Sequence, residues 1–532
     1  MRYLSLLTIL LASLLALWSC AKEPTMTFDD VEQRSLKAWM EKYHPELVDN
    51  YQMDGGYYVD LIDEGILDSV AISGKDVWVW FDFTARSLEG LVQETRNADL
   101  AEQLTTYTSH THYVPALRFS GADSHTMMEG TYLATFNKLN IRDKESGEMK
   151  EVEVRYGTKL RLYLPSSVLD SNMDSDDGGY EGEFVSDGSK PMIVDMTIWG
   201  HIGNPVAYEG ERVKSFAEAN GGMCEEHKAV IEEEADKEDD SATQSVRRRS
   251  TRTEEEGEES IDTRPLEFFD GRWHQPADTL EHLLVNYSYS PARTTINFRG
   301  ALGSDTLKYK GENEYNAGRV YGNGQLDDVD RRINEALVKR FGEGIGTSDE
   351  DILKADSVHT KPTVKVWYIG RFLDGFVFDT NIDEVKEIVF GKVESKGEVL
   401  TFSTADPLNN SYILAWNYSI PTLRLGQWAE ILTVSTYGYG IEGKTGSTTT
   451  TTTSSNSYYD YANYYNYMNY MNNYYGYGYG SMYNSGYYGY NPYYYGYSMP
   501  TTGTGTTTTT TTISTEIPAY APLLFQVFVE KK

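Results

Sequence analysis

Residues 225–262 read EEHKAVIEEEADKEDDSATQSVRRRSTRTEEEGEESID, and this stretch sets the strongest limit on how the chain can fold. It consists of blocks of charge without apolar periodicity. Such a segment cannot bury enough apolar surface to offset the entropy lost on ordering. We therefore expect a disordered acidic linker over 204–264 that divides the chain into two halves. The arginines at 247–249 lie among acidic residues, so we expect them to be solvated rather than to form a binding patch.

A second stretch, over 443–515, has an equally unusual composition. Threonine runs at 448–453 and 506–512 flank a part rich in tyrosine, asparagine and glycine, which holds 19 of the 42 tyrosines between Tyr458 and Tyr497. Threonine favours strands, so the two runs could pair as the stem of a hairpin. The alternative is a disordered low-complexity loop, and the sequence leaves both open.

The remaining sequence carries helix and strand patterns in each half. Apolar residues at helical spacing predict helices over 28–43, behind an N-cap at Thr27, and over 326–341, before a C-terminal Gly342. The similarity of DVWVWF to VKVWYI, and of RYGTKLRLYLP to RLGQWAEILTV, indicates a divergent internal repeat. Runs of β-branched and aromatic residues predict strands over 56–62, 76–83, 152–165, 191–200, 283–290, 294–300 and 364–381.

The net charge argues against two kinds of partner, and the cysteine content argues against two kinds of site. The formal net charge is −33, which repels phosphate backbones and argues against nucleic acid as a partner. It also disfavours broad electrostatic docking on an anionic membrane. Cys224 is the only cysteine besides Cys20, so we expect no disulfide framework and no cysteine-based metal site.

The first residues predict export and a lipid anchor. Residues 1–19 combine a short positive start with an apolar run too short to span a membrane, as in a signal peptide. The LWSC that ends at Cys20 resembles the lipobox of bacterial lipoproteins, which implies lipidation of Cys20 and an outer-membrane location. The alternative is a secreted protein in which this cysteine is coincidental. The following Lys22-Glu23 resembles surface-export signals of Bacteroidetes lipoproteins, which favours the cell surface over the periplasmic face and leaves both open.

Three segments of the second half resemble, in order and spacing, the FKBP family of peptidyl-prolyl isomerases. They are VWYIGRFLDGFVFDTN at 366–381, YILAWNYSIPTLRLGQWAEILTVSTYGYG at 412–440 and EIPAYAPLLFQVFVEK at 516–531. The resemblance implies an α+β domain over 361–532, in which a twisted antiparallel sheet wraps around one short helix near Trp416–Leu423. Residues 443–515 would be an insertion in this domain, and 265–360 would be strands and a helix leading into it.

A fainter version of the same pattern covers 55–203, after an N-terminal segment and helix over 20–54. Phe81 would replace the family's tyrosine, and Gln93-Glu94 would replace its Phe-Asp pair. No tryptophan stands where the family has the floor of its pocket. The resemblance here implies the FKBP-like fold without the activity, so the fold class as a whole is two FKBP-like domains.

The resemblance also implies a set of site residues in the second domain. The backbone N–H of Ile413 and the hydroxyl of Tyr439 would bind substrate carbonyl groups, and Asp379 would order Tyr368. The pocket would be lined by the rings of Tyr368, Phe378, Trp416 and Phe525, with Trp416 as its floor and Ile517 as one wall.

These residue types suit rotation about an X–Pro bond. The barrier is about 18–20 kcal/mol because resonance gives the C–N bond partial double-bond character. The twisted amide has less charge separation than the planar one, so a dry aromatic pocket favours the transition state. The reaction needs no nucleophile, metal or redox cofactor, and we expect none.

The sequence therefore favours a lipid-anchored envelope isomerase or folding chaperone for proline-containing segments of exported or outer-membrane proteins. One alternative is a non-catalytic FKBP-like accessory subunit of an outer-membrane assembly, secretion or uptake complex. A third hypothesis, a glycan-binding lipoprotein, is supported only by the excess of tyrosine. His110-Thr111-His112 would place two imidazoles on one face of a strand, but no third ligand is nearby, so we expect surface residues there.

Overall fold

The computed structural model describes residues 27–73, 76–121, 125–144, 146–169, 190–223, 271–276, 280–298, 326–345, 349–391, 396–441, 443–444, 446–454 and 507–531. The predicted signal peptide with Cys20, the acidic stretch at 225–262 and the tyrosine-rich part of the insertion lie outside these residues. What the sequence predicts for them stays a prediction. Among the helices that are described, none has the length and apolar character needed to cross a membrane.

The N-terminal half builds a seven-stranded sheet in which all pairs are antiparallel. The strand order is β1-β2-β8-β9-β3-β4, and β5 also pairs with β3. The strands are β1 (Tyr51–Gln52), β2 (Tyr57–Asp63), β3 (Val77–Ser87), β4 (Val92–Thr95), β5 (Ala116–Ser120), β8 (Lys159–Leu164) and β9 (Met192–Ile202). A small separate hairpin joins β6 (Leu139–Arg142) to β7 (Met149–Val152).

The C-terminal half builds a six-stranded antiparallel sheet of order β10-β14-β17-β11-β12, and β13 also pairs with β11. The strands are β10 (Leu283–Asn286), β11 (Thr363–Phe372), β12 (Val377–Thr380), β13 (Leu400–Ser403), β14 (Trp428–Thr433) and β17 (Leu523–Val529). We call these two sheets the first sheet and the second sheet.

The two sheets share one topology. Without β1, the order β2-β8-β9-β3-β4 with β5 on β3 matches the order β10-β14-β17-β11-β12 with β13 on β11. The pairing register also shifts at matching points, between Ala85 and Arg86 in β3 and between Gly370 and Arg371 in β11. A shift of this kind marks a β-bulge. The predicted repeat is thus confirmed at the level of topology, and both halves are α+β with antiparallel sheets.

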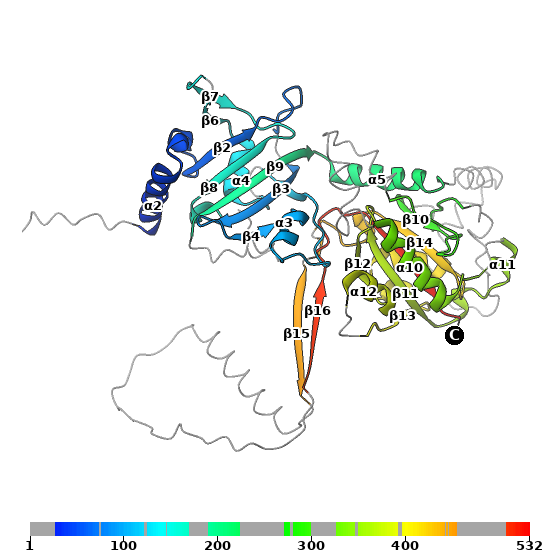
Figure 1. Cartoon of the computed structure of the whole chain (residues 1–532). Coiled ribbons are helices and arrows are strands. Elements are labelled where there is room, and N and C mark those ends of the chain that lie inside the picture. Colours follow the sequence, from blue (N-terminus) through cyan, green and yellow to red (C-terminus); the bar gives the residue numbers. More distant parts are fainter. Residues whose placement is uncertain are drawn as a thin grey trace, which may run out of the picture.

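Helices cover the sheets (Figure 1). The predicted helices over 28–43 and 326–341 are confirmed as α2 (Phe28–Tyr43) and α10 (Leu326–Phe341). Thr27 and Asp30 form a capping box at the start of α2, which satisfies backbone N–H groups that have no partner inside the helix. The others are α3 (Ala98–Gln103), α4 (Glu129–Phe136), α5 (Pro205–Ala219), α11 (Asp349–Lys354), α12 (Asp383–Phe390) and α13 (Leu414–Ser419).

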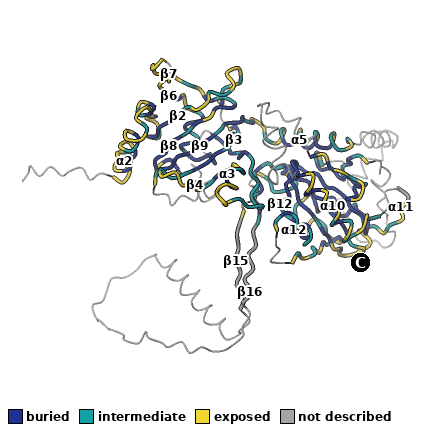
Figure 2. The backbone as a smooth tube through the Cα atoms, viewed as in Figure 1, coloured by how far each residue is buried: buried dark blue, intermediate teal, exposed yellow. Residues whose placement is uncertain are grey.

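The central strands of the second sheet are buried on both faces. Every residue of β14 and of β17 is buried, as the dark strands in Figure 2 show. On one face, Phe341 of α10 packs against Trp428, with ring centroids 5.6 Å apart. On the other, Trp416 of α13 packs against Phe525, with centroids 5.4 Å apart. The sheet therefore lies between a long helix and a short one.

The predicted linker over 204–264 begins too early. Residues Pro205–Ala219 form α5, whose side chains Val213 and Phe216 are fully buried in the core of the second sheet. Asn204 caps the helix by accepting a hydrogen bond from the Ala207 N–H, and proline follows it. These capping signals stand in the sequence. The physical reason for the error is that the apolar face of α5 is short and finds its partner in the other half of the chain.

Three smaller predictions also change. Residues 294–298 are not a strand, because the Asn297 N–H donates to the side chain of Asn220 instead of to a neighbouring strand. The strand expected over 152–165 is split between β7 and β8 by a turn at Gly157, whose φ is +82°. The helix expected near 416–423 is α13, which continues as a 3₁₀ turn over Ile420–Thr422.

The two threonine runs pair. Strand β15 (Ser447–Ser454) runs antiparallel to β16 (Thr507–Ser514), with Thr448 opposite Ile513 and Ser454 opposite Thr507. Of the two alternatives left open by the sequence, the described part of the insertion has the hairpin stem. Figure 1 shows this stem leaving the molecule from between the two sheets.

A buried polar group lies under α10. The Glu430 side chain on β14 is 2% exposed and accepts a hydrogen bond from Asn286 Nδ2 at 3.0 Å. Nearby, Arg371 and Asp330 form an ion pair at 2.7 Å. Burial raises the pKa of Glu430 to about 8, so this carboxyl group keeps its proton at neutral pH.

We expect the free energy of unfolding to fall between about pH 5 and pH 8, by up to about 1.4 kcal/mol per pH unit. The folded Glu430 holds its proton, whereas the unfolded carboxyl group, with its ordinary pKa of 4.5, releases it. Urea unfolding at several pH values measures this slope. Glu430→Gln should flatten it and stabilise the protein at pH 8, while the exposed Glu387→Gln should not. Equal slopes for wild type and both variants would contradict the assignment.

Candidate functional site

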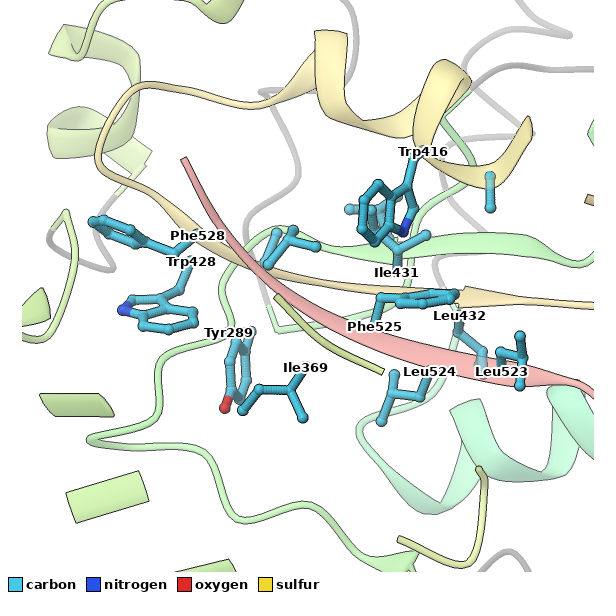
Figure 3. Packing of buried hydrophobic residues seen from close by; sticks show 14 of the residues in the cluster. Tyr289, Ile369, Trp416, Trp428, Ile431, Leu432, Leu523, Leu524, Phe525 and Phe528 are labelled. Carbon is cyan, nitrogen blue, oxygen red and sulfur yellow. The ribbon is translucent and has the colours of Figure 1, made fainter. Parts of the chain in front are cut away.

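Four aromatic rings meet on the face of the second sheet that carries α13. The rings of Tyr368 on β11 and of Trp416 on α13 have centroids 4.8 Å apart, at an interplanar angle of 69°. Phe525 on β17 meets Trp416 at 5.4 Å and Phe378 on β12 at 5.8 Å, both nearly edge to face. Figure 3 shows the indole of Trp416 descending from its helix toward Phe525 on the sheet. We call these four rings the aromatic cluster.

Strand periodicity and one glycine place these rings. Side chains two residues apart point to the same face of a strand, so Tyr368 and Phe372 of β11 flank position 370 on the cluster side. Position 370 is glycine, and a Cβ built there would lie 2.6 Å from Cζ of Phe378. The ring of Phe378 therefore crosses β11 at the one place where no side chain stands. Gly370 was not among the predicted site residues.

A hydrogen-bonded pair borders the cluster. The Tyr368 hydroxyl donates to Asp379 Oδ2 at 2.7 Å. Burial, and then the nearby Asp379 charge, raise the pKa of Tyr368. The same two causes raise the pKa of Tyr439 to about 12. Both phenols keep their protons at neutral pH and can act as hydrogen-bond donors.

Two further donors of the candidate site have no partner among the described residues. The Ile413 backbone N–H, at the N-cap of α13, makes no hydrogen bond in the described part of the chain. The Trp416 indole Nε1 is buried and has none there either. Proteins rarely leave a buried donor such as this indole N–H unpaired, and the exceptions gather at functional sites, whereas the Ile413 N–H is one of the groups that a helix start leaves open to a ligand.

Ile517 lies at the base of the insertion. Its backbone N–H donates to the Lys444 carbonyl at 2.8 Å, and the Lys444 N–H donates back at 2.7 Å. The side chain of Ile517 is 2% exposed and belongs to the same hydrophobic core as the aromatic cluster. Lys444 Nζ lies 5.9 Å from the centroid of the Tyr439 ring. The hairpin stem thus starts beside two of the predicted site residues.

The structure brings most of the predicted residues together. Direct contacts join Tyr368, Phe378, Asp379, Trp416 and Phe525. Tyr439 and Ile413 border this group, and Ile517 shares its core.

Two rings beside the cluster were missed by the sequence prediction. Phe372 lies 5.1 Å from Phe378, between centroids. Tyr412 lies 5.7 Å from Trp416 and 6.0 Å from Phe402, between centroids. Its position directly before Ile413 was the available signal.

The first sheet lacks this arrangement. At the matching register, Ala85 takes the place of Gly370, pairing with Val194 and Glu94 where Gly370 pairs with Phe525 and Asp379. Counting back two residues from Ala85 and from Gly370, Phe83 stands in the place of Tyr368. The sequence prediction put Phe81 in that place and was wrong by two residues. Helix α4 contains no tryptophan and buries Gly130, Thr131, Leu133, Ala134 and Thr135, whereas α13 buries Trp416.

The histidine pair is half-buried, although surface residues were expected there. His110 stacks on Phe390 at 4.2 Å and His112 stacks on Phe372 at 4.6 Å, both between centroids. These loop residues of the N-terminal half thus pack against the second sheet and its helix α12. In the part of the chain that the structure describes, no group of three His, Cys, Asp or Glu side chains is placed to hold a metal ion.

Comparisons with known proteins find likenesses among solved structures alone. No family model matches the chain, and no curated protein matches it. Among solved structures, the crystal structure of the three FKBP domains of wheat FKBP73 is similar over 90% of this chain and 94% of that one. The sequence identity is 10% and the TM-score is 0.18. A likeness at that score supports no conclusion, so the strand order and the contacts described above stand on their own.

We expect Gly370→Ala to displace the Phe378 ring and to lower the free energy of unfolding by about 1–3 kcal/mol, the usual cost of overpacking a core. Near-UV circular dichroism reports the change around the rings, and urea unfolding reports the stability. The matched control is Gly203→Ala, where a Cβ would meet nothing within 4 Å. Equal stability of the two variants would contradict the packing described here.

Proposed function

We propose that the second sheet and α13 form an FKBP-like domain that binds proline-containing segments and catalyses cis-trans isomerisation of their X–Pro bonds. The observation that carries this proposal is the Tyr368–Asp379 hydrogen bond beside the edge-to-face rings of Trp416, Phe378 and Phe525. If these residues served only to pack the core, the presence of the rings would be explained. The carboxylate held against them would not be.

Each group has a physical role in this reaction. The rings offer an apolar surface to the proline ring, and Trp416, at 5% exposure, is buried with Phe378 and Phe525. The unpaired Ile413 N–H and the protonated Tyr439 hydroxyl would donate to carbonyl groups of the client and fix its orientation. Because the twisted amide is less polar than the planar one, an apolar surface stabilises the transition state relative to the ground state.

The first sheet has a different role in this proposal. Ala85 leaves no room for a ring in the place of Phe378, where Gln93 stands, and α4 offers no tryptophan. We assign it no isomerase activity. The predicted lipid on Cys20 would hold the whole chain at the outer membrane, with exported or outer-membrane proteins as clients.

One observation favours the non-catalytic alternative, an accessory subunit of an outer-membrane assembly, secretion or uptake complex. Trp416 is covered by Tyr368 and Tyr412, so a bound proline ring must first separate it from one of them. A cluster that stays closed could serve only as a core, and the domain would then act through its surface.

Trp416→Phe should lower kcat/KM for an X–Pro peptide by about tenfold, which corresponds to about 1.4 kcal/mol of lost transition-state stabilisation. The mature full-length chain is assayed by NMR exchange between the cis and trans forms. The matched control is Trp428→Phe, a buried tryptophan on the opposite face of the same sheet, which should leave kcat/KM unchanged. No acceleration by the wild type would overturn the enzyme proposal and favour the accessory subunit.

Lipidation is tested separately. Expressed in a bacterium that processes lipoproteins, the wild type should partition into the detergent phase, because each buried CH₂ of an acyl chain contributes about 0.8 kcal/mol. Cys20→Ala should move the protein to the aqueous phase, whereas Cys224→Ala should not. An unmodified wild-type N-terminus by mass spectrometry would contradict the anchor.

A further inference from the structure

Helix α5 ties the two sheets together. It follows β9 of the first sheet in the chain, and Val213 and Phe216 on one of its faces are fully buried in the core of the second sheet. On the same helix, the Arg212 guanidinium lies 5.9 Å from the Trp80 ring of β3, and Tyr208 meets that ring edge to face at 5.6 Å. One helix therefore contacts both sheets.

A buried carboxylate of α5 holds the turn that carries Tyr439. Glu209 is fully buried and accepts two hydrogen bonds from Ser435, from its backbone N–H at 2.7 Å and from its hydroxyl at 2.8 Å. Burial raises the pKa of Glu209, and the bonds from Ser435 oppose that rise. The Ser435 carbonyl in turn accepts from the N–H groups of Gly438 and Gly440, on either side of Tyr439. Glu209 thus fixes the first residue of this turn.

A histidine of the N-terminal half holds the loop between β11 and β12. His112 Nε2 bonds to Asp374 Oδ2 at 2.6 Å, and Asp374 also accepts from the Phe376 N–H. Burial alone would raise the pKa of Asp374, but the charge and hydrogen bond of His112 lower it. The His112 ring stacks on Phe372, whose own ring lies 5.1 Å from Phe378 of the aromatic cluster.

Two arginines of the N-terminal half hold the segment beside Ile517. Arg96 pairs with Glu516 at 3.2 Å and Arg118 pairs with the same carboxylate at 3.7 Å. Burial would raise the pKa of Glu516, but Arg96 and Arg118 lower it. A cavity of about 640 Å³ lies here, lined by residues of both halves that include Glu94, Glu516 and Pro518. Glu94 occupies in the first sheet the position that Asp379 occupies in the second. The segment with Glu516 and Ile517 therefore lies beside the place in the first sheet that corresponds to the candidate site of the second.

These contacts converge on one region. Glu209, His112 and the arginine pair reach three separate segments, 435–440, 372–378 and 516–517, and each segment carries a residue of the candidate site. We propose that the N-terminal half is a built-in support for the proline site, with Glu209, His112 and Arg96 as positioning residues. The inference rests on the proposed function of that site and assigns a role to the sheet that lacks activity.

The full-length mature chain is required for the test, because a fragment starting after α5 would lose Val213 and Phe216 from the second core. The first measurement is hydrogen exchange of the peptide over 434–440, without any ligand. Glu209→Ala should speed exchange there, because Ser435 loses both of its partners. Glu209→Gln should not, because the amide oxygen can accept from the Ser435 N–H and the amide nitrogen can donate to the Ser435 hydroxyl. The control is Glu218→Ala, an exposed residue of the same helix.

The second measurement is calorimetric titration with a short peptide that contains one leucyl-proline bond. Glu209→Ala should weaken the Kd by about tenfold, while Glu209→Gln and Glu218→Ala keep the wild-type value. A variant that merely unfolds in part would lower the number of binding sites per chain and leave the Kd of the remainder unchanged. Restored affinity in Glu209→Gln therefore separates positioning from loss of folded protein.

His112 offers an independent pair of variants. His112→Phe keeps a ring to stack on Phe372 but loses the bond to Asp374, and His112→Ala loses both. We expect the affinity for the peptide to fall in the order wild type, His112→Phe, His112→Ala.

The outcomes separate the two proposals. Unchanged exchange over 434–440 in Glu209→Ala, or unchanged Kd in both Glu209→Ala and His112→Ala, would overturn the supporting role. A wild type that binds no peptide would overturn the proposed function, and the exchange measurement, which needs no ligand, would still decide whether Glu209 holds the turn.

Discussion

Strand β17 is buried along its whole length, and the C-terminal half is organised around that burial. A strand in this position needs apolar cover on both faces, and the two covers differ. Helix α10 covers one face, where the sheet also carries buried polar side chains such as Glu430. Helix α13 covers the other with a single large ring, Trp416. The candidate site is the second cover, so the residues proposed to bind proline also complete the core.

The two repeats show how one topology can keep or lose a site. Their strand orders and their bulges match, so the backbone offers the same platform twice. The difference starts at one Cβ. Gly370 leaves space that the Phe378 ring fills, whereas the matching residue of the first sheet, Ala85, carries a Cβ. Without a ring there, a tryptophan above it would have little to pack against, and α4 contains no tryptophan.

Much of the fold was open to prediction from sequence, for local reasons. An N-cap and the spacing of apolar residues predict helix α2, and a run of alternating aromatic residues predicts strand β3. All eight site residues were predicted by resemblance, and five of them contact one another directly.

What the sequence did not predict depends on contacts between distant segments. Arg96 and Glu516 stand 420 positions apart, and neither has a neighbour in sequence that suggests the pairing. Helix α5 was missed because its apolar face suits a core made by the other half of the chain. Gly370 was missed because its importance lies in the absence of an atom, which only the packed Phe378 ring makes visible.

The strand order also sets the sequence in which the molecule can be assembled during synthesis. The last strand of the first sheet, β9, ends at Ile202, so that sheet can close early. The second sheet has the final strand of the chain, β17, at its centre, between β14 and β11. Until residues 523–529 emerge, Phe216 on α5 has no finished core to enter. Apolar surface left uncovered during synthesis is where association between chains begins, so the position of β17 makes completion of the second core a late step.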